Sequence, residues 1–224
     1  SLLPNCPLQQ VHNKFPKVNG QFESVDVPGL YFAGALTHGL DYLKFSSSGF
    51  IHGFRYNSIL LAHHLAEQLA AVSEKANACL SFDHDELVRH IFEELENDSG
   101  MYLQPGFIIK VLRLGAGQRW QPLGYKTLKW LEDYLPKNDL LLAISLEYGD
   151  IHQFDNALSI PRFPGKPDKS VHIHPVIRIK NCQKAKQINL EENLENNFTR
   201  TADNCHRVDD FIKQSHETSN QQMI

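Results

Sequence analysis

The chain has 224 residues, enough for one or two domains with a real hydrophobic core. Its 22 basic and 26 acidic side chains give a formal net charge of −4, which argues against binding to nucleic acid or attachment to a membrane through basic residues. Apolar residues make up 42% of the sequence, which excludes general disorder, and no apolar run is long enough for a membrane span.

The first quarter of the chain predicts a loop, a strand and a long helix. Residues 1–24 are polar with scattered Pro, whereas residues 30–33 are a short apolar run, typical of a strand buried on both faces. Gly34 ends this run, and the serines at 46–48 are candidate N-caps for a helix over residues 49–72. The residues expected to form its apolar stripe are Phe54, Leu61, Leu65, Leu69 and Val72.

The middle of the chain alternates helical and extended patterns. Asp83 or Asp85 is expected to cap a helix that ends near Leu95. The ranges 107–114, 140–148 and 171–180 predict strands, 115–117 a hairpin turn, and 123–135 a short amphipathic helix. Pro175 favours an edge strand or a bulge.

The composition changes after residue 180. Residues 181–224 are rich in Asn and Gln and predict a polar, partly disordered tail. The exception is residues 203–214, where Val208, Phe211 and Ile212 are expected to dock as a short helix.

Residues 28–56 carry the clearest functional pattern, a strand, a glycine, a loop, a serine run and a helix. The N-terminus of a helix presents unpaired N–H groups and a partial positive charge, so it suits an anionic or electron-rich ligand group. In a flavoprotein, that group is the pyrimidine edge of the isoalloxazine, which becomes negative on reduction.

Residues 27–34 resemble the second flavin-binding motif of flavoproteins with two dinucleotide-binding domains. Residues 34–44 and 49–56 are more specific, and resemble the endoplasmic-reticulum FAD-dependent oxidoreductases associated with degradation. That family belongs to the pyridine nucleotide-disulfide oxidoreductase and flavin monooxygenase-like superfamily. A looser resemblance continues over residues 101–114, 146–149, 174–177 and 206–211.

The resemblance implies an α/β fold with three parts. Residues 1–75 would be the C-terminal portion of a Rossmann-like FAD-binding domain, 76–180 a smaller α/β extension, and 181–224 a largely disordered tail. His38 would be the candidate proton-transfer residue beside the ring. The implied FAD contacts are Gly34, Ala35, Leu36, Asp41, Tyr42, Ser48, Gly49, Phe50 and Ile51.

The implied activity is that of an FAD-dependent, NADPH-using oxidoreductase of the endoplasmic-reticulum lumen. Its implied partners are misfolded glycoproteins, lumenal disulfide reductases and the ubiquitin-ligase adaptor machinery. Two alternatives remain, a non-catalytic quality-control adaptor with a structural or lost flavin, and a flavin monooxygenase-like enzyme.

Several departures qualify the resemblance. Ala35 stands where many members of the superfamily have an Asp for the ribityl chain, and Asp41 is the candidate substitute. A Gly-x-Gly-x-x-Gly pyrophosphate motif is missing. Since the sequence also lacks an initiator Met and a signal peptide, we expect a fragment that is inactive alone. The chain ends without a retention tetrapeptide.

Other residues are candidates for different chemistry. His172 and His174 alternate on one strand face, but no third ligand is spaced to complete a zinc site, and we predict no metal. Lys44 and Arg55 are candidate phosphate contacts or surface charges. The sequons at Asn97 and Asn197 are candidate glycosylation sites. No Cys-x-x-Cys pair is present among Cys6, Cys79, Cys182 and Cys205, whose pairing the sequence leaves open.

Overall fold

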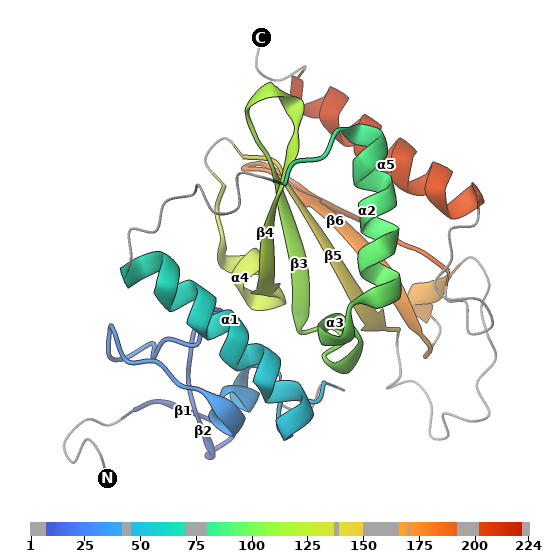
Figure 1. Ribbon diagram of the computed structural model, residues 1–224. Coiled ribbons are helices and arrows are strands. Elements are labelled where there is room, and N and C mark those ends of the chain that lie inside the picture. The colour runs from blue at the N-terminus through green and yellow to red at the C-terminus, as the bar shows by residue number, and fades with distance from the viewer. Residues whose placement is uncertain are drawn as a thin grey trace.

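A computed structural model describes residues 8–41, 46–69, 80–136, 139–149, 166–169, 171–191 and 202–220. The centre of the molecule is one sheet of five strands, flanked by helices on both faces (Figure 1). The fold is therefore a mixed α/β fold, as the sequence predicts. No helix of the described residues is apolar and long enough to cross a bilayer.

All strands of the sheet are antiparallel, in the order β4-β3-β5-β6-β7. Strands β3 (Ile108–Leu114), β5 (Leu141–Tyr148) and β6 (Ile173–Lys180) confirm the three predicted strands. The turn after β3 contains the short 3₁₀ helix η3 (Ala116–Gln118), which confirms the hairpin turn at 115–117.

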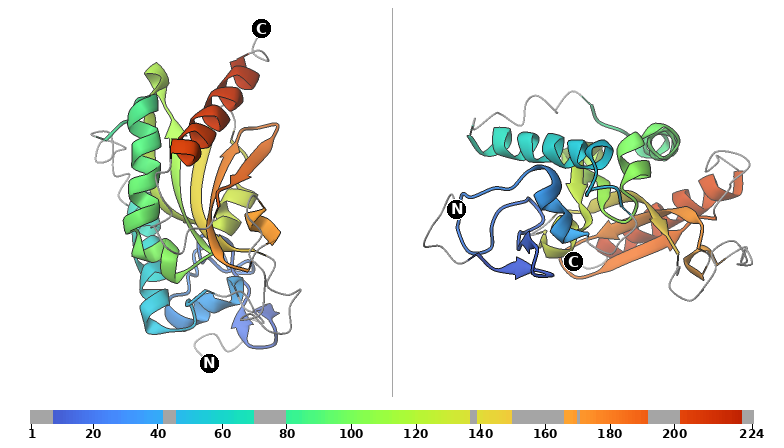
Figure 2. Two further views of the ribbon diagram at one scale, coloured as in Figure 1. Left: turned by 90° about the vertical axis from the view of Figure 1, so that its right-hand side faces the viewer. Right: turned by 90° about the horizontal axis from the view of Figure 1, so that it is seen from below.

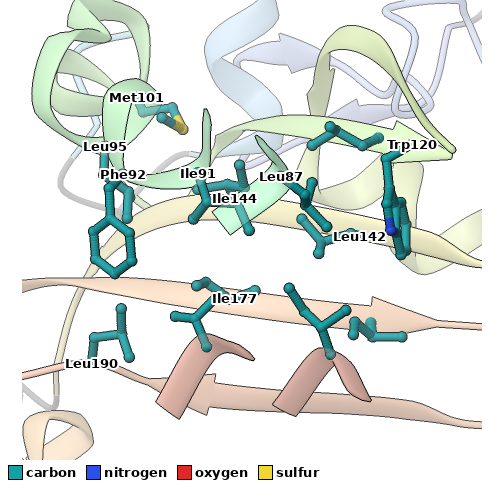
Figure 3. Close-up of a cluster of buried hydrophobic side chains, with 14 of the residues drawn as sticks. Leu87, Ile91, Phe92, Leu95, Met101, Trp120, Leu142, Ile144, Ile177 and Leu190 are labelled. Atoms are coloured by element: carbon teal, nitrogen blue, oxygen red, sulfur yellow. The ribbon is translucent and has the colours of Figure 1, made fainter. Parts of the chain in front are cut away.

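One face of the sheet carries the main hydrophobic core. It is covered by α2 (His84–Asn97) and α5 (Ala202–Asn220). Figure 3 shows side chains of α2 pointing toward those of β5 and β6. The fully buried members include Leu87, Ile91, Phe92, Trp120, Leu142, Ile144, Ile177, Val208 and Ile212. Burying a Leu, Ile or Phe side chain contributes about 1.5–3 kcal/mol each, so this face supplies much of the driving force for folding.

Asp83 rather than Asp85 is the cap of α2. Its side chain accepts a hydrogen bond from the backbone of Glu86, and the Glu86 side chain accepts one from the backbone of Asp83. This reciprocal capping box satisfies two N–H groups that the helix leaves unpaired. A short helix, α3 (Ser99–Leu103), follows directly and leads into β3.

The opposite face of the sheet is covered by α4 (Leu128–Asp133), whose Leu131 packs on Ile109 and Val111. The predicted helix over 123–135 is therefore wrong in its first half, because β4 extends over Trp120–Thr127. Leu123 is a bulged residue, since β3 pairs Val111 with Gly124 and Leu112 with Pro122.

The N-terminal segment and α1 (Ile51–Leu69) lie beside one end of this sheet (Figures 1 and 2). The segment contains β1 (Gln10–Val11), β2 (Phe15–Pro16) and the 3₁₀ helix η1 (Gly34–Leu40). A second buried cluster joins it to the sheet, and consists of Phe22, Leu60, Leu61, Phe107 and Ile108.

The expected strand over residues 30–33 is wrong. Tyr31 forms a single antiparallel bridge with Glu23, and the surrounding residues are half-exposed. A strand buried on both faces needs paired neighbours on both sides, and the described residues give this segment only that one bridge.

Helix α1 confirms the predicted helix and part of its apolar stripe, since Leu61 is buried and Leu65 packs against the second buried cluster. Leu69 is 85% exposed, and Val72 lies outside the described residues. The buried face also includes Gly53, Asn57, Leu60 and His64. Sequence spacing missed Gly53, Asn57 and His64 because two of them are polar and one is glycine.

Pro175 lies in β6, which has β5 on one side and β7 on the other, so the expected edge strand is wrong. The ladder between β6 and β7 (Ala185–Asn189) begins at Val176, and the Pro175 carbonyl accepts a hydrogen bond from the Leu190 N–H at 2.9 Å. Pro175, which has no N–H, therefore lies just outside the ladder between β6 and β7.

The polar tail, residues 181–224, contributes strand β7 and helix α5. Residues 185–189 form β7, which the composition did not predict. The expected short helix is confirmed within α5, where Val208 and Ile212 are fully buried in the main core and Phe211 packs against it.

Candidate functional site

The segment 34–51 begins with η1, whose first residues lie at the protein surface. Gly34 has φ +66°, a conformation that side chains with a β-carbon rarely adopt. A β-carbon at this position would meet nothing within 4 Å, and the next two residues, Ala35 and Leu36, are exposed. The backbone at Gly34 is thus accessible to a ligand.

The start of α1 is also exposed. Phe50 and Ile51 leave 66% and 74% of their surfaces in solvent, although both side chains are large and apolar. The first turn of an α-helix has N–H groups without intrahelical partners. The N–H of Phe50 already donates to the Ser47 carbonyl at 2.9 Å, so the backbone donors beside this apolar surface come from Ile51 and the first turn of α1.

Three polar side chains connect the end of η1 to the start of α1. The Nδ1 atom of His38 lies 2.8 Å from the Ser48 hydroxyl and 3.3 Å from Oδ1 of Asp41. The Ser48 hydroxyl donates in turn to Oδ2 of Asp41. Ser48 therefore holds Asp41 in place, three residues before α1 begins.

Asp41 is completely buried, with its charge facing this network. Burial raises the pKa of its carboxyl above the ordinary value of 3.8, and this effect outweighs the hydrogen bond from Ser48 and the charge of His38, which lower it. Its Oδ1 atom has no hydrogen-bond partner among the described residues. The carboxyl is therefore held inside the protein by His38 and Ser48.

A second buried network fixes η1 on α1. The Asn57 side chain donates to the Thr37 hydroxyl at 2.8 Å, and the Thr37 hydroxyl donates to the Gly34 carbonyl at 2.7 Å. Gln104 then donates to Asn57 at 2.5 Å and to the Gly53 carbonyl at 2.9 Å. These hydrogen bonds fix the backbone of η1, and thereby the position of Gly34.

The residues expected to bind the cofactor fall into three groups. Asp41, Ser48 and Gly49 meet around His38, where a β-carbon on Gly49 would lie 3.3 Å from the ring. The exposed group consists of Ala35, Leu36, Phe50 and Ile51. Tyr42 lies outside the described residues, as does Lys44.

Four residues of the site were missed by sequence reasoning, namely Thr37, Gly53, Asn57 and Gln104. Gly53 and Asn57 are four residues apart on a predicted helix, so both lie on one face. A glycine and an amide sharing one helix face was the available signal, because neither residue favours a helix interior unless packing requires it.

Arg55 lies at a different place. It lines a cavity of about 450 Å³ with Asp98, Tyr102 and other residues of the α2–α3 turn. Its guanidinium donates to the Tyr56 hydroxyl at 2.9 Å. Asn97 is exposed at the end of α2 beside this cavity, whereas Asn197 lies outside the described residues.

The remaining candidates do not form a common site. The His174 side chain is buried, and its Nδ1 lies 3.3 Å from the His172 carbonyl. No group of three or more metal-binding side chains occurs within the parts of the chain that are described. Cys182 is an exposed thiol on the β6–β7 turn, whereas Cys6 and Cys79 lie outside the described residues.

The described residues fit one side of a flavin. Gly34 leaves room for the close approach of a ligand, and Leu36, Phe50 and Ile51 supply apolar contact beside the N-terminal end of α1. Asp41 does not fit a contact to the ribityl hydroxyls, because its carboxyl is enclosed by His38 and Ser48. A side chain at position 34 would not crowd the atoms of this chain itself, since the space there is open.

Comparison with known proteins gives one partial similarity. No protein-family model matches the chain, and no solved structure matches it. Over 54 residues the chain is 43% identical to FAD-dependent oxidoreductase domain-containing protein 2 of Mus musculus. The matched part is 24% of this chain and 8% of the mouse protein. The chain is thus similar, over about a quarter of its length, to a protein named as an FAD-dependent oxidoreductase.

Proposed function

We propose that this chain is part of an FAD-dependent oxidoreductase and that residues 34–51 form one side of its flavin site. The observation that carries the proposal is the open backbone at Gly34 beside the exposed start of α1. The partial identity to a protein of that name supports it independently.

The chain's own residues would bind and orient the flavin. Gly34 would allow close approach, and the exposed side chains of Leu36 and Phe50 would shield the ring from water. The N–H groups at the start of α1 would face the electron-rich pyrimidine edge and favour negative charge there. When bound, FAD supplies hydride and electron transfer.

The finer proposal concerns reductant, compartment and partners. We propose NADPH as the reductant and the endoplasmic-reticulum lumen as the compartment, with roles in the disposal of misfolded glycoproteins alongside disulfide reductases and ubiquitin-ligase adaptors. The motif resemblance of residues 27–56 supports this proposal. The exposed Asn97 is consistent with a glycosylated lumenal protein.

Matched glycine variants test the flavin site. Gly29 and Gly34 both have positive φ, and a β-carbon at either meets nothing within 4 Å. Gly29→Asp and Gly34→Asp should therefore cost similar stability, about 1 kcal/mol. We expect only Gly34→Asp to reduce the FAD content of the full-length protein that carries this chain. Equal FAD content in the two variants would contradict the proposed site.

Stopped-flow reduction separates the oxidoreductase from the adaptor. The full-length protein should show flavin bleaching on mixing with NADPH in the absence of oxygen. Bound flavin that NADPH does not reduce would indicate an adaptor with a structural flavin. Oxygen-dependent NADPH consumption without an added thiol acceptor would indicate a monooxygenase-like enzyme instead.

Glycosidase treatment tests the compartment. The full-length protein isolated from cells should shift in electrophoresis after the treatment, and Asn97→Gln should reduce that shift. The absence of any shift in the wild-type protein would count against the lumenal assignment.

A further inference from the structure

The two edge strands of the sheet differ in how open they are to further pairing. β4 contains Pro122 and the bulge at Leu123, and Phe82 pairs with its Trp120 through two backbone hydrogen bonds of 2.8 Å. Proline and bulges are features that keep an edge strand from pairing with another chain. β7, orange in Figure 2, contains neither, and its five residues pair with β6 in an unbroken register. Among the described strands of the sheet, β7 therefore has the open edge.

The hydrogen bond at the end of β7 shows which of its backbone groups face outward. The Leu190 N–H donates to the Pro175 carbonyl, so this pair belongs to the hydrogen-bonded positions of the ladder. In an antiparallel pair, residues that exchange hydrogen bonds alternate with residues that do not. The N–H and C=O groups of Ala185 and Gln187 therefore face away from β6. None of these four groups has a partner within the described parts of the chain.

The charged side chains along this edge are basic. The chain has no acidic residue between Asp168 and Glu191. Lys184 and Lys186 are exposed, and neither has a carboxylate partner among the described residues. The exposed Arg207 of α5 adds a third positive charge at the end of β7, where its guanidinium donates to a backbone carbonyl of the strand at 2.9 Å. Like charges on neighbouring strands repel, so this edge disfavours a second copy of β7 and attracts a strand with carboxylates.

A cavity of about 310 Å³ reaches β7 on the sheet face that carries α4. Its lining extends from Leu128 and Leu131 of α4, across β6, to Ala185 and Gln187. The Lys180 ammonium in its wall is already engaged, because it donates to two backbone carbonyls of α4. The two leucines and the small Ala185 make the cavity suitable for an aliphatic side chain of a strand that lies beside β7.

We propose that the open edge of β7 binds an extended acidic segment of a partner protein as a sixth strand of the sheet. The segment pairs antiparallel, like the other strands, and exchanges hydrogen bonds with Ala185 and Gln187. Lys186 lies between these two residues, at a position where facing residues of two strands come closest, about 4.5 Å between Cα atoms. A carboxylate faces Lys186 there, and the aliphatic neighbours of that carboxylate face the cavity, because side chains alternate along a strand.

Binding of a short synthetic peptide that alternates valine and glutamate tests the proposal. In the free ¹⁵N-labelled chain, the amides of Ala185 and Gln187 should exchange rapidly with solvent, and the peptide should slow both of them. A peptide that alternates valine and lysine is the matched control and should have no effect. Unchanged exchange at both amides with the glutamate peptide, or equal effects of the two peptides, would overturn the proposal. None of these residues belongs to the proposed flavin site, so the result is independent of FAD binding.

Two variants separate the backbone contribution from the charge. Gln187→Pro removes an outward N–H without removing a hydrogen bond to β6, so the fold should remain and peptide binding should be lost. Lys186→Glu should weaken binding of the glutamate peptide about tenfold and allow the lysine peptide to bind. Lys14→Glu makes the same charge change on the exposed N-terminal segment and should leave both peptides unaffected. If Gln187→Pro does not fold, the charge reversal at Lys186 decides, and an unchanged preference for glutamate in Lys186→Glu would contradict the proposal.

The same exchange measurement distinguishes other occupants of the edge. If the amides of Ala185 and Gln187 become protected when the concentration of the chain is raised without peptide, the edge binds a second copy and the proposal is wrong. Slow exchange of both amides in the dilute free chain would show that another part of the chain already occupies the edge, which would also overturn it. Fast exchange at every concentration, slowed only by the glutamate peptide, is the expected result.

Discussion

Gly53 lies so close to Ser47 that a β-carbon at position 53 would stand 1.9 Å from the Ser47 carbonyl oxygen. Ser47 is held there by its own N–H, which donates to the Leu103 carbonyl at 3.0 Å. The chain leading to α1 is therefore pressed against the helix at one residue. Only glycine allows this contact.

Gly53→Ala should destabilise the protein by about 2 kcal/mol, the cost of overpacking a well-packed site. In an exposed helix the same change stabilises by up to about 1 kcal/mol, so the sign of the effect is diagnostic. Chemical denaturation monitored by circular dichroism measures it. The reverse change at the exposed Ala66 of α1, Ala66→Gly, is the control for helix propensity and should cost about 1 kcal/mol. An unchanged or raised stability of Gly53→Ala would refute the contact.

Asp83→Ala should cost about 1 kcal/mol of stability, because the first turn of α2 loses its side-chain cap. Asp85→Ala should cost only about 0.3 kcal/mol, because Asp85 contributes charge in the first turn without acting as the cap. Thermal unfolding of the two variants measures the difference. A larger loss for Asp85→Ala would show that the cap is assigned to the wrong residue.

The Glu147–Arg178 pair should make stability depend on acid pH. Burial alone would raise the pKa of Glu147, but the hydrogen bonds and charge of Arg178 outweigh it and hold the pKa below the ordinary 4.5. The contribution is therefore complete above pH 4.5 and is lost as the pH falls through the lower folded value. Urea unfolding of the wild type and Glu147→Gln at several acid pH values tests this, and the variant should lose less stability on acidification.

Arg178→Met should be more harmful than Glu147→Gln at neutral pH. It leaves a carboxylate in a largely buried position without its guanidinium, which costs about 3 kcal/mol or more. Raising the acidity should relieve part of this loss, since protonation neutralises Glu147. If the stability of Arg178→Met fell on acidification as steeply as that of the wild type, this result would argue against the pairing.

His64 should destabilise the fold below neutral pH. Burial lowers its pKa from 6.5, and the nearby Lys126 lowers it further, against the opposing charges of Glu67 and Glu23. The unfolded chain therefore binds the proton first, so stability is full above pH 6.5 and declines as the pH falls from 6.5 toward the folded value. His64→Gln should reduce this slope, whereas His63→Gln on the exposed face should keep it; His90, whose pKa is also lowered by burial, supplies the remainder. Identical slopes in both variants would disprove the role of His64.

The sequence predicted those parts of the fold in which hydrophobic periodicity alone determines structure. Strands β3 and β5 consist mainly of apolar residues, and α2 has leucine and isoleucine at helical spacing after an acidic cap. Periodicity failed at Leu123, because its spacing fits a helix whereas its backbone follows the pairing of β4 with β3. Residues 30–33 failed for a related reason, since a strand depends on neighbours that composition does not reveal.

The candidate site was predicted only in part. The motif around Gly34 indicated an exposed, glycine-dependent backbone, and the structure places open space there. The burial of Asp41 against His38 and Ser48 could not be predicted, because it depends on how the end of η1 folds back on the start of α1. Local sequence indicates which residues are polar, whereas the tertiary contacts decide which of them face one another.

The cluster that contains Phe22, Leu60, Phe107 and Ile108 has a consequence for cooperativity. Phe107 directly precedes the inner strand β3 and Ile108 is its first residue, yet their burial depends on side chains from the N-terminal segment and α1. Separation of these parts would expose aromatic and aliphatic surface on both. The N-terminal segment, α1 and the sheet should therefore unfold in a single transition, with the same midpoint whether tryptophan fluorescence or helix content is followed.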